Sequence, residues 1–96
     1  MEVTDASELE SLRAGIDAVD AEILALVAQR IGLVLQIADY KRSQALPVYD
    51  PARERTVIER LIKLAPATLD AQLVRRVFER IIDESRRIEQ HQASVK

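Results

Sequence analysis

Hydrophobic side chains recur at steps of three and four residues along the first part of the chain. This spacing places them on one face of a helix, and Ser7 followed by Glu10 fits a capping box at its start. We therefore predict one long helix from about Ser7 to about Arg42, with no proline before Pro47. The stripe consists of Leu9, Leu12, Ile16, Val19, Ile23, Leu26, Leu33, Ile37 and Tyr40.

Two shorter helices are predicted after a loop. Asp50 and Pro51 are typical of a helix start, since the Asp side chain caps the first turn and proline at N1 gives up no hydrogen bond. This second helix ends at Pro66, and Thr68 is the expected cap of the third helix, which frays near His91. Their apolar positions are Val57, Ile58, Leu61, Ile62 and Ala65 in the second and Leu69, Leu73, Val74, Val77, Phe78, Ile81, Ile82 and Ile88 in the third.

Composition supports an all-α fold and removes several other classes. The 96 residues include 2 Gly, 3 Pro and no Cys, and 48% of them are hydrophobic. Without cysteine, disulfides and thiolate-bound metals are impossible. Glycine is also too scarce for a Gly-rich phosphate loop or for the turns of an all-β protein. We predict a single domain over residues 1–96, with flexible termini at about 1–7 and 91–96.

Charge argues against a nucleic-acid or a membrane partner. The formal net charge is −2, and acidic residues alternate with the arginines of the third helix, which indicates a solvated face with i,i+4 pairs. The longest apolar run, Ile23–Ala28, is too short to span a bilayer. The acidic start does not resemble a signal peptide, so we expect a cytoplasmic protein. The arginines in question are Arg75, Arg76, Arg80, Arg86 and Arg87.

The length of the first helix predicts a homodimer. A helix of about 35 residues is about 50 Å long, whereas a compact chain of 96 residues has a diameter of about 30–35 Å. The apolar stripe continues over the whole helix, so something beyond the monomer must cover it. A second copy of the chain across a two-fold axis is the simplest solution.

Polar side chains interrupt the apolar stripes on all three helices. Each alone has an ordinary explanation: a basic side chain reaching solvent, a carboxylate at a helix start, a serine bonded to its own i−4 carbonyl, or a solvated residue near a helix end. Together, at places that can converge, they indicate a polar pocket inside a helical bundle. They are Arg30 and Lys41 in the first helix, Asp50 and Glu54 in the second, and Ser85 and Glu89 in the third.

The two cations of this set would face one cavity and need anions there, because buried charge without a partner is very costly. Arg30 offers a bidentate fork to a carboxylate, and Lys41 offers a movable point charge. The set contains no cysteine, no well-placed histidine and no nucleophile–base pair, so we expect neither a metal nor a cofactor. The residues favour a site for a small dicarboxylate that acts by position and electrostatics.

A third cation, Arg13, fits the site only through a second chain. It lies 17 residues before Arg30, which is about 25 Å along the helix and about 100° around it. In an antiparallel dimer with its axis near residues 21–22, Arg13 of one chain comes level with Arg30 of the other. The alternative is that Arg13 is a solvated surface charge.

Five stretches of the chain form an ordered series: Leu12–Asp17, Leu26–Arg30, Ile37–Lys41, Val48–Glu54 and Phe78–Ser85. In this order and spacing the chain, from about residue 9 to residue 90, resembles the all-helical chorismate mutases of the AroQ type. The resemblance implies an intertwined helical homodimer with two equivalent sites. It also implies conversion of chorismate to prephenate by a Claisen rearrangement, without a cofactor, in aromatic amino-acid biosynthesis.

The resemblance assigns the basic residues to the substrate carboxylates. Arg30, and Arg13 from the partner chain, would hold them, with help from Ser85. Lys41 would contact a carboxylate and the ether oxygen, where negative charge grows as the C–O bond breaks.

The resemblance assigns the acidic residues to the ring hydroxyl and the ether oxygen. Glu54, with the backbone at Asp50, would hold the hydroxyl. Glu89 stands where many bacterial relatives have a Gln that donates to the ether oxygen, and fungal members are similar to this chain here. A carboxylate only accepts, so Glu89 can donate only when protonated. We therefore predict that activity falls as the pH rises through the titration of Glu89.

Three other functions are compatible with these residues. Isochorismate pyruvate lyases resemble this fold and use the same cations, although they have a bulkier aromatic in place of Ser85 and lack the Asp50-Pro51 cap. An amino-deoxychorismate mutase would differ in the ring substituent of its substrate. A dimeric helical adaptor would explain the long helix, but not the aligned polar interruptions. A partner synthase that activates the enzyme is also compatible with the sequence.

Overall fold

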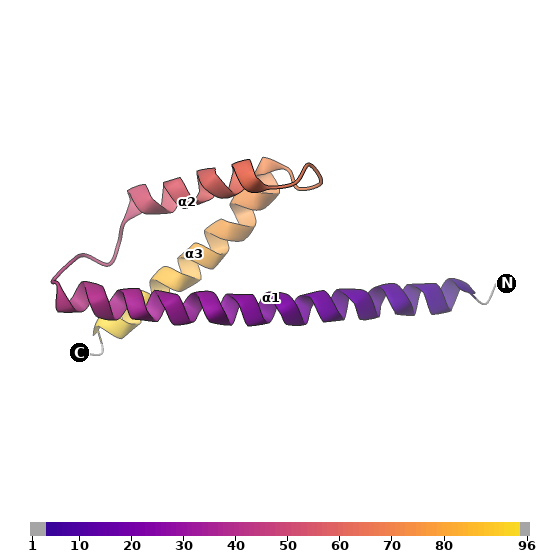
Figure 1. The fold of residues 1–96 in the computed structure, drawn as a ribbon, viewed down its shortest axis with the longest axis horizontal. Coiled ribbons are helices and arrows are strands. Elements are labelled where there is room, and N and C mark those ends of the chain that lie inside the picture. Colours follow the sequence, from indigo (N-terminus) through magenta and orange to yellow (C-terminus); the bar gives the residue numbers. More distant parts are fainter. Residues whose placement is uncertain (1–3, 95–96) are drawn as a thin grey trace. The chain divides into compact units, whose positions relative to one another are not determined.

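The computed structural model describes the backbone of residues 4–94 and consists of three helices joined by two loops (Figure 1). They are α1 (Thr4–Ser43), α2 (Pro51–Leu64) and α3 (Ala71–Ser94), and no strand occurs in the described part of the chain. The predicted all-α class and the number of helices are confirmed. The chain divides into two compact units, residues 1–30 and residues 31–96, which are described one at a time.

The unit of residues 1–30 contains the first part of α1. The helix begins at Thr4, so the predicted capping box at Ser7 and Glu10 is wrong, because both residues lie inside the helix. No proline or glycine precedes Ser7, so nothing ends the helix there. The apolar stripe of this segment faces solvent in the single chain: Leu12 is 64% exposed and Ile16 is 59% exposed.

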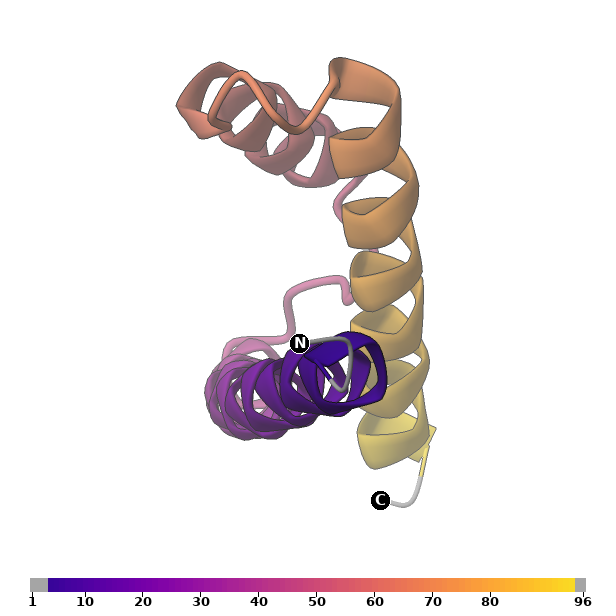
Figure 2. The ribbon, with the colours of Figure 1, turned by 90° about the vertical axis from the view of Figure 1, so that its right-hand side faces the viewer.

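The unit of residues 31–96 has its hydrophobic core between α2 and α3. Val57 and Ile58 of α2 pack with Ile82 of α3 in this core, and all three are buried. Some of the predicted apolar positions therefore meet, whereas Leu69, Leu73 and Val77 remain exposed. Figures 1 and 2 show the two helices converging at the loop that joins them. The partly buried residues packed against this core are Leu61, Ile62 and Phe78.

The start and end of α2 are as predicted. The Asp50 carboxylate accepts a hydrogen bond of 3.1 Å from the backbone N–H of Arg53, and Pro51 occupies the first helical position. The helix ends at Leu64, with Ala65 as its C-cap just before Pro66. Because the helix starts at Asp50 and Pro51, Glu54 lies in the first turn of α2.

The start of α3 differs from the prediction. The backbone N–H of Leu73 donates to Oδ1 of Asp70 at 2.8 Å, and that of Val74 donates to the carbonyl of Asp70 at 3.1 Å. Asp70 is therefore the N-terminal cap, and the choice of Thr68 was wrong. Thr68 lies in the preceding turn, where the backbone N–H of Leu69 donates to the carbonyl of Pro66 at 2.9 Å. The helix also continues to Ser94, beyond the predicted end near His91.

Replacing the cap of α3 should cost stability. We expect Asp70→Ala to lower the free energy of unfolding by about 1 kcal/mol, because the N–H of Leu73 loses its acceptor. Thr68→Ala is the matched control and should change it by less than half as much. Urea unfolding at one fixed protein concentration, followed by circular dichroism, measures both. Equal losses in the two variants would contradict the assignment of Asp70 as the cap.

The end of α1 turns sharply into the loop that precedes α2. The backbone N–H of Leu46 donates to the carbonyl of Lys41 at 2.8 Å, and that of Ala45 donates to the carbonyl of Arg42 at 3.2 Å. Ala45 has φ 57°, in the left-handed region. These are the two hydrogen bonds of a Schellman motif, in which the left-handed residue is usually glycine. The motif reverses the direction of the chain after Lys41, so that Val48 comes close to the Lys41 side chain.

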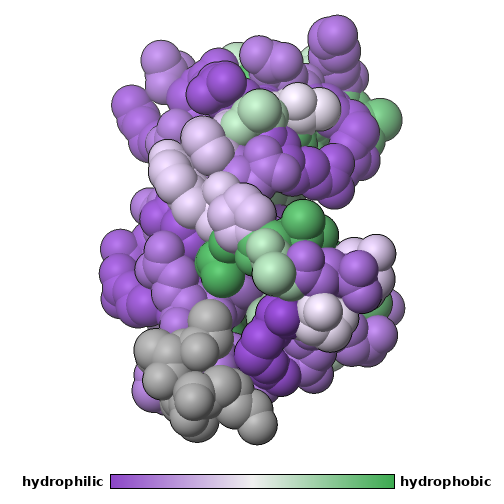
Figure 3. Space-filling view, turned by 90° about the vertical axis from the view of Figure 1, so that its left-hand side faces the viewer, coloured by the Kyte–Doolittle hydropathy of each residue, from purple (hydrophilic) through white to green (hydrophobic). Residues whose placement is uncertain are grey.

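Large hydrophobic side chains remain exposed on the single chain, and Figure 3 shows one such patch near the centre of a mostly hydrophilic face. By length and composition alone, α1 is able to span a membrane, since an 18-residue window within Ala6–Ser43 has a mean hydropathy of 1.6. The uninterrupted apolar run Ile23–Ala28 did not indicate this, because polar residues break the run without lowering the mean greatly. A helix covered by a second protein chain has the same composition, so hydropathy is weak support for a membrane span.

Candidate active site

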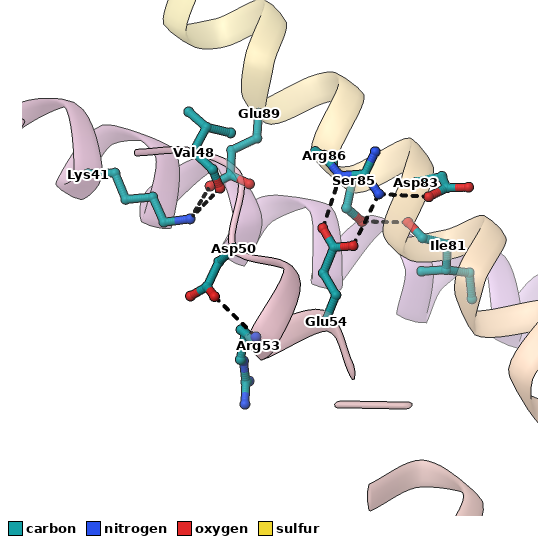
Figure 4. A network of polar contacts seen from close by, with 10 residues as sticks. All are labelled: Lys41, Val48, Asp50, Arg53, Glu54, Ile81, Asp83, Ser85, Arg86 and Glu89. Carbon is teal, nitrogen blue, oxygen red and sulfur yellow. Dashed lines mark hydrogen bonds and ion pairs between the residues drawn. The ribbon is translucent and has the colours of Figure 1, made fainter. Parts of the chain in front are cut away.

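The most buried of the described ion pairs in residues 31–96 joins the end of α1 to α3. Nζ of Lys41 donates to the carbonyl of Val48 at 2.8 Å and lies 3.2 Å from Oε2 of Glu89 (Figure 4). The side chains of Lys41 and Glu89 are 19% and 11% exposed. The Schellman turn after α1 brings the carbonyl of Val48 within reach of Lys41. Two predicted site residues from distant parts of the sequence therefore meet.

Glu89 has unused hydrogen-bonding capacity inside the protein. Its Oε2 atom is buried and accepts no hydrogen bond, although Lys41 lies within ion-pair distance. Glu89 is therefore not a solvated residue near a helix end, which was the alternative explanation for it. A buried acceptor without a hydrogen bond is costly, so a donor from a ligand would be favoured there. The same oxygen would be a donor to a ligand if it carried a proton.

Ser85 is buried one turn before Glu89 on α3. Its hydroxyl donates to the carbonyl of Ile81 at 2.7 Å, which is the i−4 bond expected of a buried helical serine. The hydroxyl oxygen also has two acceptor sites. Ser85 therefore makes the hydrogen bond of a structural serine and also lies one turn from Glu89. Its role in binding stays a prediction.

Glu54 on α2 is bound by an arginine of α3. Both of its carboxylate oxygens accept from Arg86, at 2.9 Å from Nε and 3.1 Å from Nη2 (Figure 4). The side chains of Glu54 and Arg86 are 25% and 28% exposed. The assignment of Arg86 to a solvated face was therefore wrong. Arg86 follows Ile82, a core residue, by one helical turn, and this spacing was the available signal that it points toward α2.

Arg86 is held from two further sides. Its Nη2 donates to Oδ1 of Asp83 at 2.8 Å, and its guanidinium lies 5.1 Å from the ring centroid of Tyr49, within cation–π range. The hydrogen bond to Glu54 is the main reason that the pKa of Arg86 is raised above its ordinary value, while partial burial acts in the opposite direction. Arg86 is therefore charged at every working pH, and its orientation is fixed.

The outer face of α3 carries helix-surface ion pairs, as predicted. Arg80 lies 2.9 Å from Glu84, and Arg87 lies 3.6 Å from the same carboxylate. The side chains of Arg80 and Arg87 are 74% and 71% exposed. Such pairs contribute little to stability, and they leave Arg86 as the arginine of this group that reaches another helix in the described contacts.

Asp50 acts first as a helix cap. Its side chain is engaged by the N–H of Arg53, and its carbonyl accepts from the N–H of Glu54 at 3.1 Å. The Arg53 side chain points away from the polar cluster in Figure 4. A role of the Asp50 backbone in binding stays a prediction.

Arg13 and Arg30 belong to the unit of residues 1–30. Both lie on α1, where Arg13 is exposed and Arg30 is partly buried. The place of these two arginines in the site also stays a prediction.

A groove of about 340 Å³ lies on the α2 and α3 pair, and Glu54 and Asp83 are among its lining residues. Lys41, Ser85 and Glu89 do not line it. Glu54 therefore borders the groove in addition to contacting Arg86, and its side chain is 25% exposed.

A sequence profile for chorismate mutase type II matches residues 12–90, which include every candidate site residue. The chain belongs to the chorismate mutase type II family. The solved chorismate mutase of Helicobacter pylori, in complex with prephenate, has the same fold with a TM-score of 0.84 and 32% identity. That comparison covers 92% of this chorismate mutase type II chain and 96% of the other.

Two curated relatives differ in their names and lengths. The chain is 40% identical over 84 residues to the bifunctional chorismate mutase/prephenate dehydratase of Escherichia coli K12, covering 86% of this chain and 22% of the relative. It therefore spans about a fifth of that protein. It is 35% identical over 88 residues to the 4-amino-4-deoxychorismate mutase of Streptomyces venezuelae, covering 91% of this chain and 85% of the relative.

Within this chorismate mutase type II chain, the structure forms two polar contact groups on α3. Lys41 contacts Glu89, and Glu54 contacts Arg86. Arg86 and Glu89 are three residues apart on α3, so one turn of this helix carries both groups, with Ser85 beside them.

Proposed function

We propose that this chain is a chorismate mutase that converts chorismate to prephenate in aromatic amino-acid biosynthesis. In this Claisen rearrangement one C–C bond forms as the ether C–O bond breaks, and every atom and electron stays within the substrate. The protein therefore needs no cofactor and no covalent intermediate. Its task is to bind the compact conformer and to stabilise the charge that develops.

The observation that carries the proposal is the buried pair of Lys41 and Glu89. Lys41 supplies a fixed positive charge, and Oε2 of Glu89 is a buried oxygen without a hydrogen bond. Lys41 would stabilise negative charge on the ether oxygen and contact a carboxylate. A protonated Glu89 would donate to the same ether oxygen. Such charges act strongly because water is largely excluded from them.

The remaining candidates would hold the ends of the substrate. Arg30 and Arg13 of the partner chain would bind the two carboxylates, with Ser85 assisting. Glu54 would accept from the ring hydroxyl, with the backbone at Asp50 nearby. Each role is the one that the family resemblance implies for that position.

We also propose that the enzyme is a homodimer in the cytoplasm. The stripe on α1 supports the homodimer, since its side chains are large, apolar and exposed in the single chain. A second copy of α1 would cover the stripe and bring a second Arg13 toward each site. The stripe would then be an interface between protein chains rather than a membrane-facing surface.

A second candidate, an amino-deoxychorismate mutase, is supported by the identity of 35% to the Streptomyces venezuelae relative. Isochorismate pyruvate lyase is a third and would use the same cations. We favour a mutase over the lyase because Ser85 is small and the Asp50-Pro51 cap is present.

Product analysis tests the proposal. The purified protein is incubated separately with chorismate, isochorismate and 4-amino-4-deoxychorismate, and the products are followed by NMR. We expect prephenate from chorismate at the highest kcat/KM. Pyruvate and salicylate from isochorismate would identify a lyase instead. No turnover of any of the three would favour a binding module, provided that the protein is folded by circular dichroism.

A further inference from the structure

The ion pair of Glu54 and Arg86 has no part in the roles proposed above. Glu54 was assigned to the ring hydroxyl, but the resemblance gave no reason for an arginine opposite it. Both oxygens of Glu54 are hydrogen bonded to Arg86. The following inference rests on the proposed function and concerns the ring substituent that Glu54 would meet.

The geometry leaves Glu54 able to bind a further donor. A carboxylate has about four acceptor positions, and Arg86 occupies two of them with a parallel pair of hydrogen bonds. The Glu54 side chain is 25% exposed, so a part of it is open to a ligand. A hydroxyl group is therefore able to donate to Glu54 while Arg86 remains in place.

Arg86 cancels the negative charge of Glu54 at this position. It cannot move away easily, because Asp83 and Tyr49 hold its guanidinium from other sides. The Asp83 side chain is 52% exposed, so water and salt screen its charge more strongly than that of Glu54. A ligand at Glu54 thus meets a neutralised carboxylate with a fixed cation behind it.

We infer that Arg86 makes this site selective for a ring hydroxyl over a protonated ring amine. A neutral hydroxyl needs only an acceptor, which Glu54 supplies. An ammonium group would gain little from a carboxylate whose charge is already compensated, and it would lie close to the guanidinium, where like charges repel. Sequence identity alone does not decide between the two, since relatives of both names match this chain.

Paired substrates test the inference. The kcat/KM for chorismate is divided by that for 4-amino-4-deoxychorismate in the wild type, in Arg86→Gln and in Arg86→Lys. We expect Arg86→Gln to lower this ratio about tenfold, because the repelling charge is gone. Arg86→Lys should keep most of the preference. Arg87→Gln is the matched control, since it removes a charge from the exposed neighbouring position, and its ratio should equal that of the wild type.

The ratio separates selectivity from structural damage. A variant that merely loosens α2 against α3 would lose activity on both substrates equally and leave the ratio unchanged. An unchanged ratio in Arg86→Gln would overturn the inference while leaving the proposed function intact. A wild-type protein that converts neither substrate would instead overturn the proposed function.

A second measurement needs no variant. In the wild type, the kcat/KM for 4-amino-4-deoxychorismate, divided by that for chorismate, should rise as the pH increases through the titration of the substrate amine. The reason is that the neutral amine is no longer repelled. The titratable groups that contact Arg86 are Glu54 on α2, Asp83 on α3 and Tyr49 in the loop. A ratio independent of pH over this range would contradict the inference.

Discussion

Mixing two inactive variants, Arg13→Ala and Arg30→Ala, is expected to restore about a quarter of the wild-type activity. Each alone should lose at least about a hundredfold in kcat/KM, because each site lacks one cation for a substrate carboxylate. Both residues lie on the continuous helix α1, 17 residues apart. That is about 25 Å at 1.5 Å per residue, too far for one small ligand. A complete site would therefore need Arg30 from one chain and Arg13 from another.

The expected recovery follows from the symmetry. After random exchange of equal amounts, about half of the dimers are mixed, and each mixed dimer has one complete site and one site without either arginine. The exchange is made by joint unfolding and refolding, and mixed dimers are identified by native mass spectrometry. Mixing Arg13→Ala with the double variant Arg13→Ala/Arg30→Ala is the control and should restore nothing. No recovery among verified mixed dimers would refute the shared site.

The sequence predicted those parts of the fold that local chemistry decides. Asp50 and Pro51 start α2 as expected, because a cap and a proline act on the nearest backbone atoms. The predicted starts of α1 and α3 were wrong. For α3, more than one residue was able to cap the helix. Thr68 and Asp70 are both suitable residue types two positions apart, and the turn between them favours Asp70. At the start of α1, Ser7 and Glu10 fit a capping box, but no proline or glycine stands before them to keep the helix from beginning earlier.

The sequence predicted only those site residues that stand as polar residues in an otherwise apolar stripe. Lys41 and Glu89 interrupt stripes of hydrophobic residues, and the structure brings them together. Arg86 was missed because it lies in a run of alternating charges. This pattern does not distinguish an exposed arginine from one that faces another helix. Its partner Glu54 is 32 residues away in sequence, and only the packing of α2 on α3 reveals that contact. The carbonyl of Val48 was missed because main-chain groups leave no mark in a sequence.

Glu89 should give this enzyme an activity that falls with pH. The wild-type kcat/KM for chorismate should decrease as the pH rises, approaching tenfold per pH unit, because only a protonated carboxyl of Glu89 donates to the ether oxygen. The direction follows from the role: the active form carries the proton, so it is present below the titration and lost above it. Glu89→Gln has a permanent N–H donor at the same place, and its profile should be flat.

The profile is measured between about pH 5 and pH 9. After a tenfold decline per unit over two pH units, Glu89→Gln should exceed the wild type by about a hundredfold if their low-pH activities are equal. Glu84→Gln removes a carboxylate from the outer face of α3, where Glu84 pairs with Arg80 and Arg87, and it should keep the wild-type decline. A flat wild-type profile would show that Glu89 does not donate. A decline shared by Glu89→Gln would assign the titration to another group, and Glu89 would then serve chiefly to hold Lys41.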